Sequence, residues 1–443
     1  MQTVKEKTTA AKSTETVKRV RPLLKQMYRN AHEAKEKGQP IAYCMGLSML
    51  DEVLRAMDIV PIFTEHYAGL CAAKRASGRF LEESDVEGFS NVICGYARNG
   101  LGFDSLRHKL GEIPPDSPDG GMPMPDVLLP SSRGCDTSLK WFQALGRYLD
   151  APVYNIEELW PPKDANIREI KDRYVKYGVK ELEGLVAFLE KHTGKKMDWD
   201  RLESAIAITD ETLHLWWEVL QLRKAVPCPM PTQDHANAMV PQGFFLGTQE
   251  ALDFYRDLYN EVKHRVDNKI GAIPEEKYRI MWGIGLPPWH TLSIFNYFES
   301  HGAVGTVEGF YRIGSPGIAS PKQFDIPSGI SPLEHIAQRY FHTYSFNHEK
   351  AQAGCGEPIA QYLLDYIDEY KVDGYVEHMS TSCRLWSLGQ LHYSNVVREY
   401  RKDLPFMTWS SDIIDLSTFN ETEVKAQIDA FIEVLDTNKR RKA

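Results

Sequence analysis

Short apolar runs alternate with helix-forming stretches in two separate parts of this 443-residue chain. Strands that alternate with helices are typical of parallel sheets, because a crossover helix joins each strand to the next. The pattern therefore predicts an α/β protein with two Rossmann-like (flavodoxin-like) lobes, each built on a parallel sheet. The expected strands are IAYCMGL, IVPIF, DVLLPSS and PVYNIE in the first lobe, and YRIMWGIG, AVGTVEGF, VDGYVEHM and PFMTWSSD in the second.

A helical segment is expected between the two lobes. Apolar side chains from Leu182 to Leu189 recur at i, i+3, i+4 and i+7, which is one face of a helix. Asp200 and Glu203 resemble a capping box at the start of the following helix. The sequence thus divides into an N-terminal helical arm (1–38), a first α/β lobe (39–165), a helical connecting segment (166–276) and a second α/β lobe (277–443).

Charge and composition narrow the class of protein. Charged residues make up 26% of the chain and hydrophobic residues 42%, as in soluble globular proteins. The net charge of −9 argues against nucleic acid or an anionic membrane surface as a partner. No apolar run approaches the roughly 18 residues that cross a bilayer, and the N-terminus has no secretory signal. Seven cysteines without disulfide-type spacing suit a reducing compartment, so we expect a cytoplasmic protein.

Three cysteines share one kind of sequence context. Cys94, Cys135 and Cys383 lie in polar or glycine-containing stretches, and the last two directly follow expected strands. Open α/β sheets bind ligands beyond the carboxyl ends of their strands, so thiols there suggest a soft metal centre. Their wide spacing matches no compact cluster motif, and for any single buried cysteine an inert packed role is the simpler interpretation. The cysteines expected to be unligated are Cys71, Cys228 and Cys355.

Several common catalytic motifs are absent from the sequence. There is no GxxxxGK[ST] motif, so this chain is not expected to hydrolyse ATP itself. Gly283-Ile-Gly285 begins like a dinucleotide-binding loop, but Pro288 occupies the position of the third glycine. The sequence also has no HExxH, CxxC or GxSxG, which excludes the commonest zinc and serine-hydrolase sites.

The cysteine-containing segments resemble those of the 2-hydroxyacyl-CoA dehydratase and benzoyl-CoA reductase family. The similar segments are CGYARNGLG from Cys94, GCDTSLKWF around Cys135, and VDGYVEHMSTSC ending at Cys383. The resemblance covers about residues 40–437 and is strongest to the larger core subunit of ATP-dependent benzoyl-CoA reductases. The chain departs from the family pattern at Gln427, where an arginine is frequent.

This resemblance implies a definite chemistry. Cys94, Cys135 and Cys383 would hold a [4Fe-4S] cluster in which one iron lacks a cysteine ligand. Electron transfer to an aromatic acyl-CoA would give a cyclic dienoyl-CoA. In a 2-hydroxyacyl-CoA the same electron transfer would expel hydroxide, and a third alternative is a non-catalytic electron-transfer member of the family. The implied partners are a paralogous second core subunit, an ATP-hydrolysing electron-activating subunit and a ferredoxin-type donor.

Further residues are candidates for substrate binding and proton transfer. Ser48 and Cys44 follow the first strand and are candidates to approach the open iron, although Ser48 could simply cap the next helix. His290 is a candidate proton donor and Trp289 a candidate wall of an aromatic pocket. The alternative for this pair is a histidine at a helix start beside a packed tryptophan. Weaker candidates for structural or cluster-tuning roles are His378, His392 and Asp412.

Overall fold

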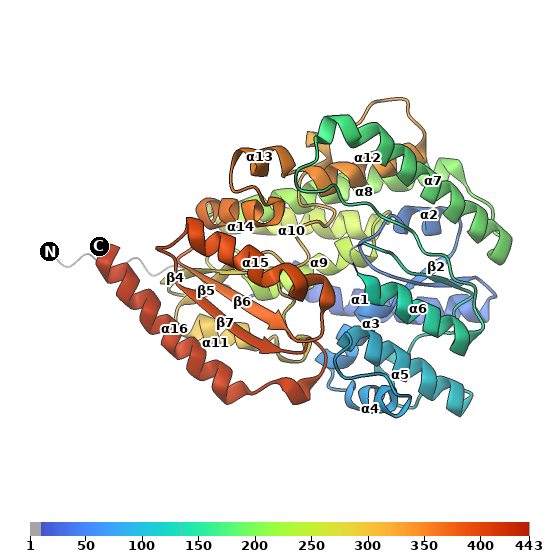
Figure 1. Cartoon of the computed structure of the whole chain (residues 1–443), viewed down its shortest axis with the longest axis horizontal. Helices are drawn as coiled ribbons and strands as arrows, with labels where there is room; N and C mark the ends of the chain where they lie inside the picture. The colour runs from blue at the N-terminus through green and yellow to red at the C-terminus, as the bar shows by residue number, and fades with distance from the viewer. Residues whose placement is uncertain (1–9, 134, 443) are drawn as a thin grey trace.

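Two parallel β-sheets form the framework of the protein (Figure 1). A computed structural model describes residues 10–133 and 135–442. The first sheet has the order β2-β1-β3, with β1 (Ile41–Cys44), β2 (Val60–Phe63) and β3 (Val127–Leu129). The second has the order β5-β4-β6-β7, with β4 (Tyr278–Trp282), β5 (Ala303–Glu308), β6 (Gly374–Ser380) and β7 (Phe406–Ser411). All described pairings are parallel, so the predicted α/β class with two Rossmann-like lobes is confirmed.

Burial explains why these apolar runs form strands. Every residue of β1, β3, β4 and β5 is buried, because helices cover both faces of each sheet. Strands of this kind are near-continuous apolar runs without the alternation of half-exposed strands. The prediction was wrong at PVYNIE, where Leu128 pairs with Val153 and Ser131 with Ile156 as isolated bridges. Pro152 lacks an N–H group, which limits the ladder that this segment can form.

Both sheets have the same strand order relative to the chain. In each sheet, the first strand along the chain lies between the second and the third. The second strand is added on one side of the first strand and the third strand on the other side, which makes a topological switch point. Flavodoxin-like sheets bind ligands at such switch points, in the crevice outside the carboxyl ends of the strands. The loops after β1 and β3, and those after β4 and β6, are therefore the positions where a site is expected.

Helices surround both sheets. The first lobe contains α2 (Asp51–Ala56), α3 (Thr64–Ala73), α4 (Gly78–Val86), α5 (Gly95–Leu110) and α6 (Asp136–Leu149). The middle of the chain forms α7 (Ile167–Thr193), α8 (Trp199–Leu222), α9 (Thr232–Phe244) and α10 (Gln249–Asp267). The second lobe adds α11 (Ile294–Ser300), α12 (Pro332–Ser345), α13 (His348–Ala353), α14 (Pro358–Glu369), α15 (Arg384–Tyr400) and α16 (Glu421–Lys442).

Two local predictions are corrected by the structure. Helix α8 is capped by Asp198, whose carboxylate accepts a hydrogen bond of 3.0 Å from Arg201 N, and not by Asp200 with Glu203. The polar N-terminal sequence also predicts a frayed helical arm, but α1 (Val20–Glu36) is packed against the lobes. Tyr28 of α1 is fully buried and its hydroxyl lies 2.8 Å from His66 Nδ1 of α3.

No helix among the described residues combines the length and the apolar character that crossing a bilayer requires.

Candidate metal centre and substrate pocket

One cavity between the two lobes is lined by Cys94, Cys135 and Cys383, and we call it the cysteine cavity. It has a volume of about 60 Å³. Each of the three cysteines is the residue that immediately precedes a helix, namely α5, α6 and α15. The positive ends of three helix dipoles therefore converge on the cavity, and this arrangement stabilises negative charge there.

The two switch points supply most of the cavity wall. Met45, Gly46 and Leu47 follow β1, and Ser131, Arg133 and Cys135 follow β3. Leu286 follows β4, and Cys383 with Leu385 follows β6. Cys94 is the exception, because it enters from the loop between α4 and α5 and not from a strand end. The carboxyl edges of the two sheets thus face each other across the thiols.

The pKa values of two thiols in this cavity, Cys94 and Cys135, are raised. Burial raises the pKa of Cys94 well above its usual value, and the proximity of Cys383 and Cys135 raises it further. Burial, followed by the nearby Glu65 carboxylate, raises the pKa of Cys135 to about 11. A cationic metal group would displace these protons and bind the resulting thiolates.

Thiols are the soft metal-binding side chains that gather in the cysteine cavity. No three His, Cys, Asp or Glu side chains within residues 10–133 and 135–442 converge closely enough to hold one metal ion. Cys94, Cys135 and Cys383 line one shared cavity, and cysteine thiolates are the usual ligands of iron–sulfur clusters. Cys94, Cys135 and Cys383 are therefore the residues that would hold such a group.

A hydrogen-bonded contact joins the two lobes beside the thiols. The Ser382 hydroxyl, next to Cys383, donates to Asp412 Oδ2 and accepts from Gly95 N at 3.3 Å. A Cβ atom at Gly95 would lie 2.4 Å from Asp412 Oδ1, so glycine is required for this approach. We call Gly95, Ser382 and Asp412 the inter-lobe latch. The latch therefore joins Gly95, the neighbour of Cys94, to Ser382, the neighbour of Cys383, and we expect it to affect the spacing of these two thiols.

Arg133 places a positive charge in the wall of the cysteine cavity. Its guanidinium donates to the carbonyl oxygen of Leu47 at 2.7 Å and to that of Gly314 at 3.4 Å. These two carbonyl groups belong to different lobes. The side chain therefore connects the lobes and also offsets the negative charge that deprotonated thiols would carry.

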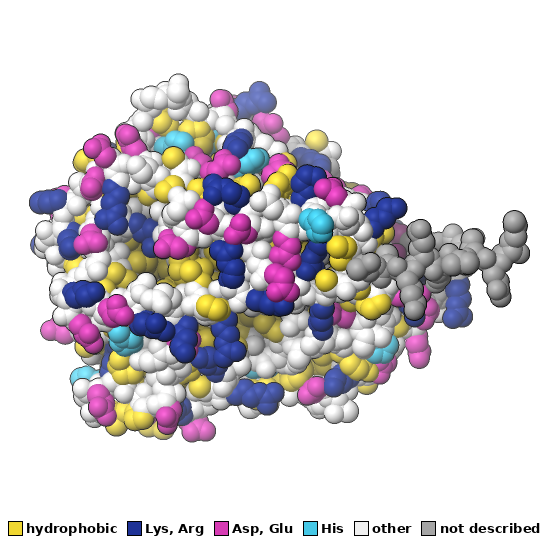
Figure 2. Space-filling view, turned by 180° about the vertical axis from the view of Figure 1, so that it is seen from behind, with side chains coloured by type: hydrophobic (Ala, Val, Ile, Leu, Met, Phe, Trp, Pro, Cys, Tyr) yellow, Lys and Arg dark blue, Asp and Glu magenta, His cyan; other side chains and the backbone are white. Residues whose placement is uncertain are grey.

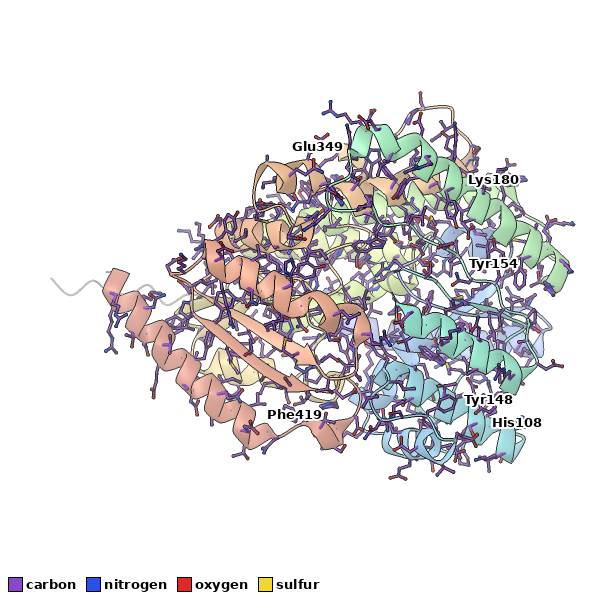
Figure 3. All side chains as sticks on the ribbon, viewed as in Figure 1. His108, Tyr148, Tyr154, Lys180, Glu349 and Phe419 are labelled. Atoms are coloured by element: carbon purple, nitrogen blue, oxygen red, sulfur yellow. The ribbon has the colours of Figure 1, made fainter. Side chains whose placement is uncertain are left out.

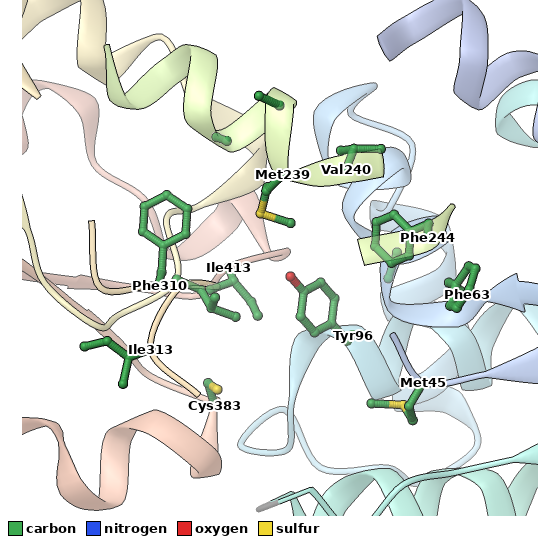
Figure 4. Packing of buried hydrophobic residues seen from close by; sticks show 14 of the residues in the cluster. Met45, Phe63, Tyr96, Met239, Val240, Phe244, Phe310, Ile313, Cys383 and Ile413 are labelled. Atoms are coloured by element: carbon green, nitrogen blue, oxygen red, sulfur yellow. The ribbon is translucent and has the colours of Figure 1, made fainter. Parts of the chain in front are cut away.

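A larger apolar pocket lies next to the cysteine cavity. Its volume is about 390 Å³, and side chains from α1, α3 and α9 line it together with Trp289 and Leu292 of the second lobe. Figure 4 shows Tyr96 between the lobes, with Met239, Val240 and Phe244 of α9 nearby and Cys383 across the gap. Both spaces share the wall residues Gly46, Leu47, Glu65, Tyr96 and Tyr311.

Of the predicted candidates Ser48, Cys44 and Trp289, only Trp289 is among the described wall residues of these two spaces. Ser48 is buried next to Leu47, but it is not among the described wall residues of either space. Cys44 is fully buried in β1, where its thiol donates to the Ala42 carbonyl at 3.4 Å. Trp289 does line the apolar pocket, as its proposed role requires.

The histidine candidates make mainly structural contacts. His290 Nε2 lies 3.2 Å from the Asp412 carbonyl oxygen, and its ring packs on Phe419, which is labelled in Figure 3. It is absent from the described walls of both spaces. His378 is buried between the Leu286 carbonyl and the Ser411 hydroxyl. His392 is exposed and pairs with Glu357.

Among the wall residues that sequence reasoning missed are the charged and tyrosine side chains Glu65, Tyr96, Arg133 and Tyr311. A usable signal existed for Glu65, because it lies two positions beyond the end of β2, at the same sheet edge as the thiols. Arg133 precedes Cys135 by two positions. Tyr96 and Tyr311 meet only through the docking of the lobes, which no local pattern reports.

The protein is thus a two-lobed α/β protein whose parallel sheets face each other across a thiol-lined cavity. The family model described as 2-hydroxyglutaryl-CoA dehydratase, D-component, matches residues 47–435. The chain therefore belongs to this family, in agreement with the resemblance seen in its cysteine segments.

Characterised relatives cover nearly the whole chain. The (R)-2-hydroxyisocaproyl-CoA dehydratase alpha subunit of Clostridioides difficile is 26% identical over 95% of this chain and 96% of its own length. The (R)-phenyllactyl-CoA dehydratase alpha subunit of Clostridium sporogenes is 26% identical over 92% and 93%. A benzoyl-CoA reductase subunit of Thauera aromatica is 26% identical over 91% and 90%. These relatives are subunits of dehydratases and a reductase that act on acyl-CoA thioesters.

Proposed function

We propose that this chain is the iron–sulfur subunit of a complex that reduces an aromatic acyl-CoA, converting benzoyl-CoA to a cyclic dienoyl-CoA. The observation that carries the proposal is the shared wall between the cysteine cavity and the apolar pocket. A thioester group could reach the thiol-lined space while its apolar acyl group or the coenzyme A arm occupies the pocket. When bound, a [4Fe-4S] cluster held by Cys94, Cys135 and Cys383 supplies low-potential electrons and Lewis acidity.

The residues of the shared wall have distinct roles in this proposal. Glu65 lines both spaces, and burial raises its pKa to about 7, so its carboxyl can deliver a proton near neutral pH. Trp289 and Phe244 provide aromatic contacts for the acyl group. Ser48 and His290 remain proposed polar contributors, ranked after Glu65 because neither lines the described walls.

Basic side chains are available for the coenzyme A phosphates. Arg21 and Lys74 line the apolar pocket, and Lys74 also pairs with Asp119 at 2.6 Å. Lys and Arg side chains also lie beside apolar surface on the face opposite to that of Figure 1 (Figure 2). The net charge of −9 makes such local basic groups necessary for an anionic ligand.

The proposal includes protein partners. Low-potential electron transfer must be coupled to an energy source, and this sequence has no nucleotide-binding motif. We therefore propose a paralogous second core subunit and an ATP-hydrolysing activating subunit that receives electrons from a ferredoxin-type donor. The relatives are themselves named as single subunits of larger enzymes, which supports an assembly with more than one kind of chain.

The proposal is tested by anaerobic reconstitution with the partner subunits. Benzoyl-CoA consumption is compared with dehydration of lactyl-CoA and 2-hydroxyglutaryl-CoA under the same reducing conditions. Consumption of benzoyl-CoA with formation of a dienoyl-CoA supports the reductase. A cluster that is reduced while neither class of thioester binds would instead identify an electron-transfer member.

The second candidate function is radical dehydration of a 2-hydroxyacyl-CoA. It is favoured by the names of the dehydratase relatives, two of which act on thioesters with apolar acyl groups. The same Glu65 carboxyl would then assist the departure of the hydroxyl group. Water release from a 2-hydroxyacyl-CoA without net electron consumption distinguishes this reaction from benzoyl-CoA reduction.

A further inference from the structure

Two tyrosine hydroxyls meet where the cysteine cavity joins the apolar pocket. Tyr96 enters from the start of α5 in the first lobe, and Tyr311 follows β5 in the second. Their phenolic oxygens are 3.1 Å apart, and both side chains line both spaces. Trp289 donates its indole N–H to the Tyr96 hydroxyl. The three aromatic residues thus form one hydrogen-bonded chain across the lobe interface.

The indole N–H takes up one acceptor position of the Tyr96 hydroxyl and so favours Tyr96 as the donor to Tyr311. An indole N–H can only donate, so the Tyr96 oxygen is an acceptor at that contact. Tyr96 can then donate its own hydrogen to the Tyr311 oxygen. Within residues 10–133 and 135–442, Tyr96 is the hydrogen-bond partner of the Tyr311 hydroxyl. With Tyr96 as the donor, the hydrogen of Tyr311 is available to a ligand in the space that its side chain lines.

The backbone holds Tyr311 in an unusual conformation. Its φ angle is +47°, in the left-handed region that bulky side chains rarely adopt. Leu47, on the opposite lobe, has a φ angle of +61° and lines the same two spaces. The Trp289 ring stacks on the Tyr311 ring with a centroid distance of 6.1 Å and an interplanar angle of 25°. Strained residues of this kind persist where surrounding packing fixes them, and they concentrate at functional sites.

We propose that Tyr311 is a catalytic residue that donates a hydrogen bond to the thioester carbonyl oxygen, with Tyr96 and Trp289 as positioning residues. This inference rests on the proposed function. Negative charge develops on the carbonyl oxygen when an electron enters the thioester, and a fixed donor stabilises that charge without moving. The contribution is the same for reduction and for dehydration, because both begin with this electron.

Tyr311 acts as a hydrogen-bond donor and keeps its proton. Burial raises the pKa of its hydroxyl well above the usual value, and the neighbouring Glu65 carboxylate adds to this effect. Proton delivery therefore stays with another group, for which Glu65 is the proposed residue. The division separates charge stabilisation by the phenol from proton transfer by the carboxyl.

The test compares two ligands that differ at the carbonyl group. Benzoyl-CoA and its thioether analogue S-benzyl-CoA, in which CH2 replaces C=O, are titrated calorimetrically into the anaerobic reconstituted complex. Tyr311→Phe should weaken benzoyl-CoA binding by about 3- to 10-fold and leave S-benzyl-CoA binding unchanged. Tyr43→Phe is the matched control, because Tyr43 is a fully buried, hydrogen-bonded tyrosine outside both walls. It should change neither affinity.

Tyr96→Phe tests the positioning role. It should weaken benzoyl-CoA binding less than Tyr311→Phe does, and it should add nothing when combined with Tyr311→Phe, since Tyr96 acts on the ligand only through the Tyr311 hydroxyl. Additive losses would show that Tyr96 acts through packing alone and would overturn its assigned role.

The outcomes separate this inference from the proposed function. An equal loss of affinity for both ligands in Tyr311→Phe, or no loss for either, overturns the inference while the function stands. If the wild-type complex binds only a 2-hydroxyacyl-CoA, the same comparison is made with that thioester and its thioether. If it binds no acyl-CoA at all, the function and the inference both fail.

Discussion

The two lobes repeat one strand order but contribute unequally to the site. In each lobe, the third strand of the sheet is followed by a loop and a cysteine that precedes a helix, Cys135 before α6 and Cys383 before α15. The first lobe adds a second thiol, Cys94, together with Glu65 and Arg133. The second lobe adds the aromatic residues Trp289 and Tyr311. Neither lobe holds all of these side chains, so the proposed metal centre requires the docking of the two lobes.

The largest effect is expected when the one cavity thiol of the second lobe, Cys383, is removed. Cys383→Ser should abolish most iron binding, because the remaining two thiols both belong to the first lobe and cannot join the lobes through metal. Cys94→Ser and Cys135→Ser should also lower the iron content. Iron and sulfide are measured in anaerobically purified protein, together with the brown absorbance of the cluster.

Cys228→Ser is the matched control for the thiol variants. Cys228 is fully buried and its thiol donates to the Met230 carbonyl at 3.2 Å, away from the cysteine cavity. The iron content of the Cys228→Ser protein should equal that of the wild type. Equal iron in all four variants would refute the ligand assignment.

A smaller effect is expected from Glu65, the first-lobe carboxyl that lines both spaces. Glu65→Gln should keep the cluster and slow turnover by about 100-fold, the usual contribution of a general acid. Since the pKa of Glu65 is raised to about 7, its acid form dominates below that value, and wild-type turnover should fall as pH rises above about 7.

His290→Ala should slow turnover less than Glu65→Gln does. A larger loss in His290→Ala would move the proton-donor role to the second lobe.

The raised pKa of Glu65 should also make the stability of the metal-free protein depend on pH. A carboxyl whose pKa rises on folding binds its proton more tightly in the native state. Its contribution is therefore fully present below its ordinary pKa of 4.5 and is lost as pH rises to about 7. Denaturant unfolding at several pH values should show a steeper decline in the wild type than in Glu65→Gln, in which the buried carboxyls of Asp51 and Asp104, whose pKa values are also raised, still contribute. Identical pH profiles for the two proteins would contradict the assigned shift.

The inter-lobe latch should give the smallest change. Ser382→Ala removes the hydroxyl that joins Gly95 N to Asp412 and leaves both partners without that contact. The expected cost is about 1–3 kcal/mol in the free energy of unfolding, with iron still bound but lost faster to a chelator. Ser417→Ala is a control, because Ser417 bonds Asp415 at an exposed position of the same lobe. Equal chelation rates in both variants would show that the latch does not set the thiol spacing.

The strands, and the positions of Cys135 and Cys383 beyond two of them, followed from the sequence because both are local signals. Apolar runs and the cysteines directly after them are adjacent along the chain. The third thiol, Cys94, does not follow a strand but precedes helix α5. This helix has no amphipathic stripe, because residues on all its sides are buried. Its Gly102 would place a Cβ 1.7 Å from the Phe80 carbonyl oxygen, so the glycine reports a packing contact that no local pattern shows.

The side chains that complete the site could not be predicted in the same way. Tyr96 and Tyr311 are 215 positions apart and meet only when the lobes dock. The N-terminal helix likewise reads as a polar arm in the sequence, but Val20, Tyr28 and Ala31 are buried against the first lobe. Long-range packing decides such contacts, and periodicity within one segment contains no information about them.

The most direct test of the account is Mössbauer spectroscopy of isotope-enriched protein purified without oxygen, as wild type and as Cys383→Ser. The account predicts a cubane iron–sulfur cluster in the wild type with one iron distinct from the others, and loss of that spectrum in the variant. A wild-type protein without iron, or a variant with an unchanged spectrum, would contradict the claim that thiols from both lobes hold the metal centre.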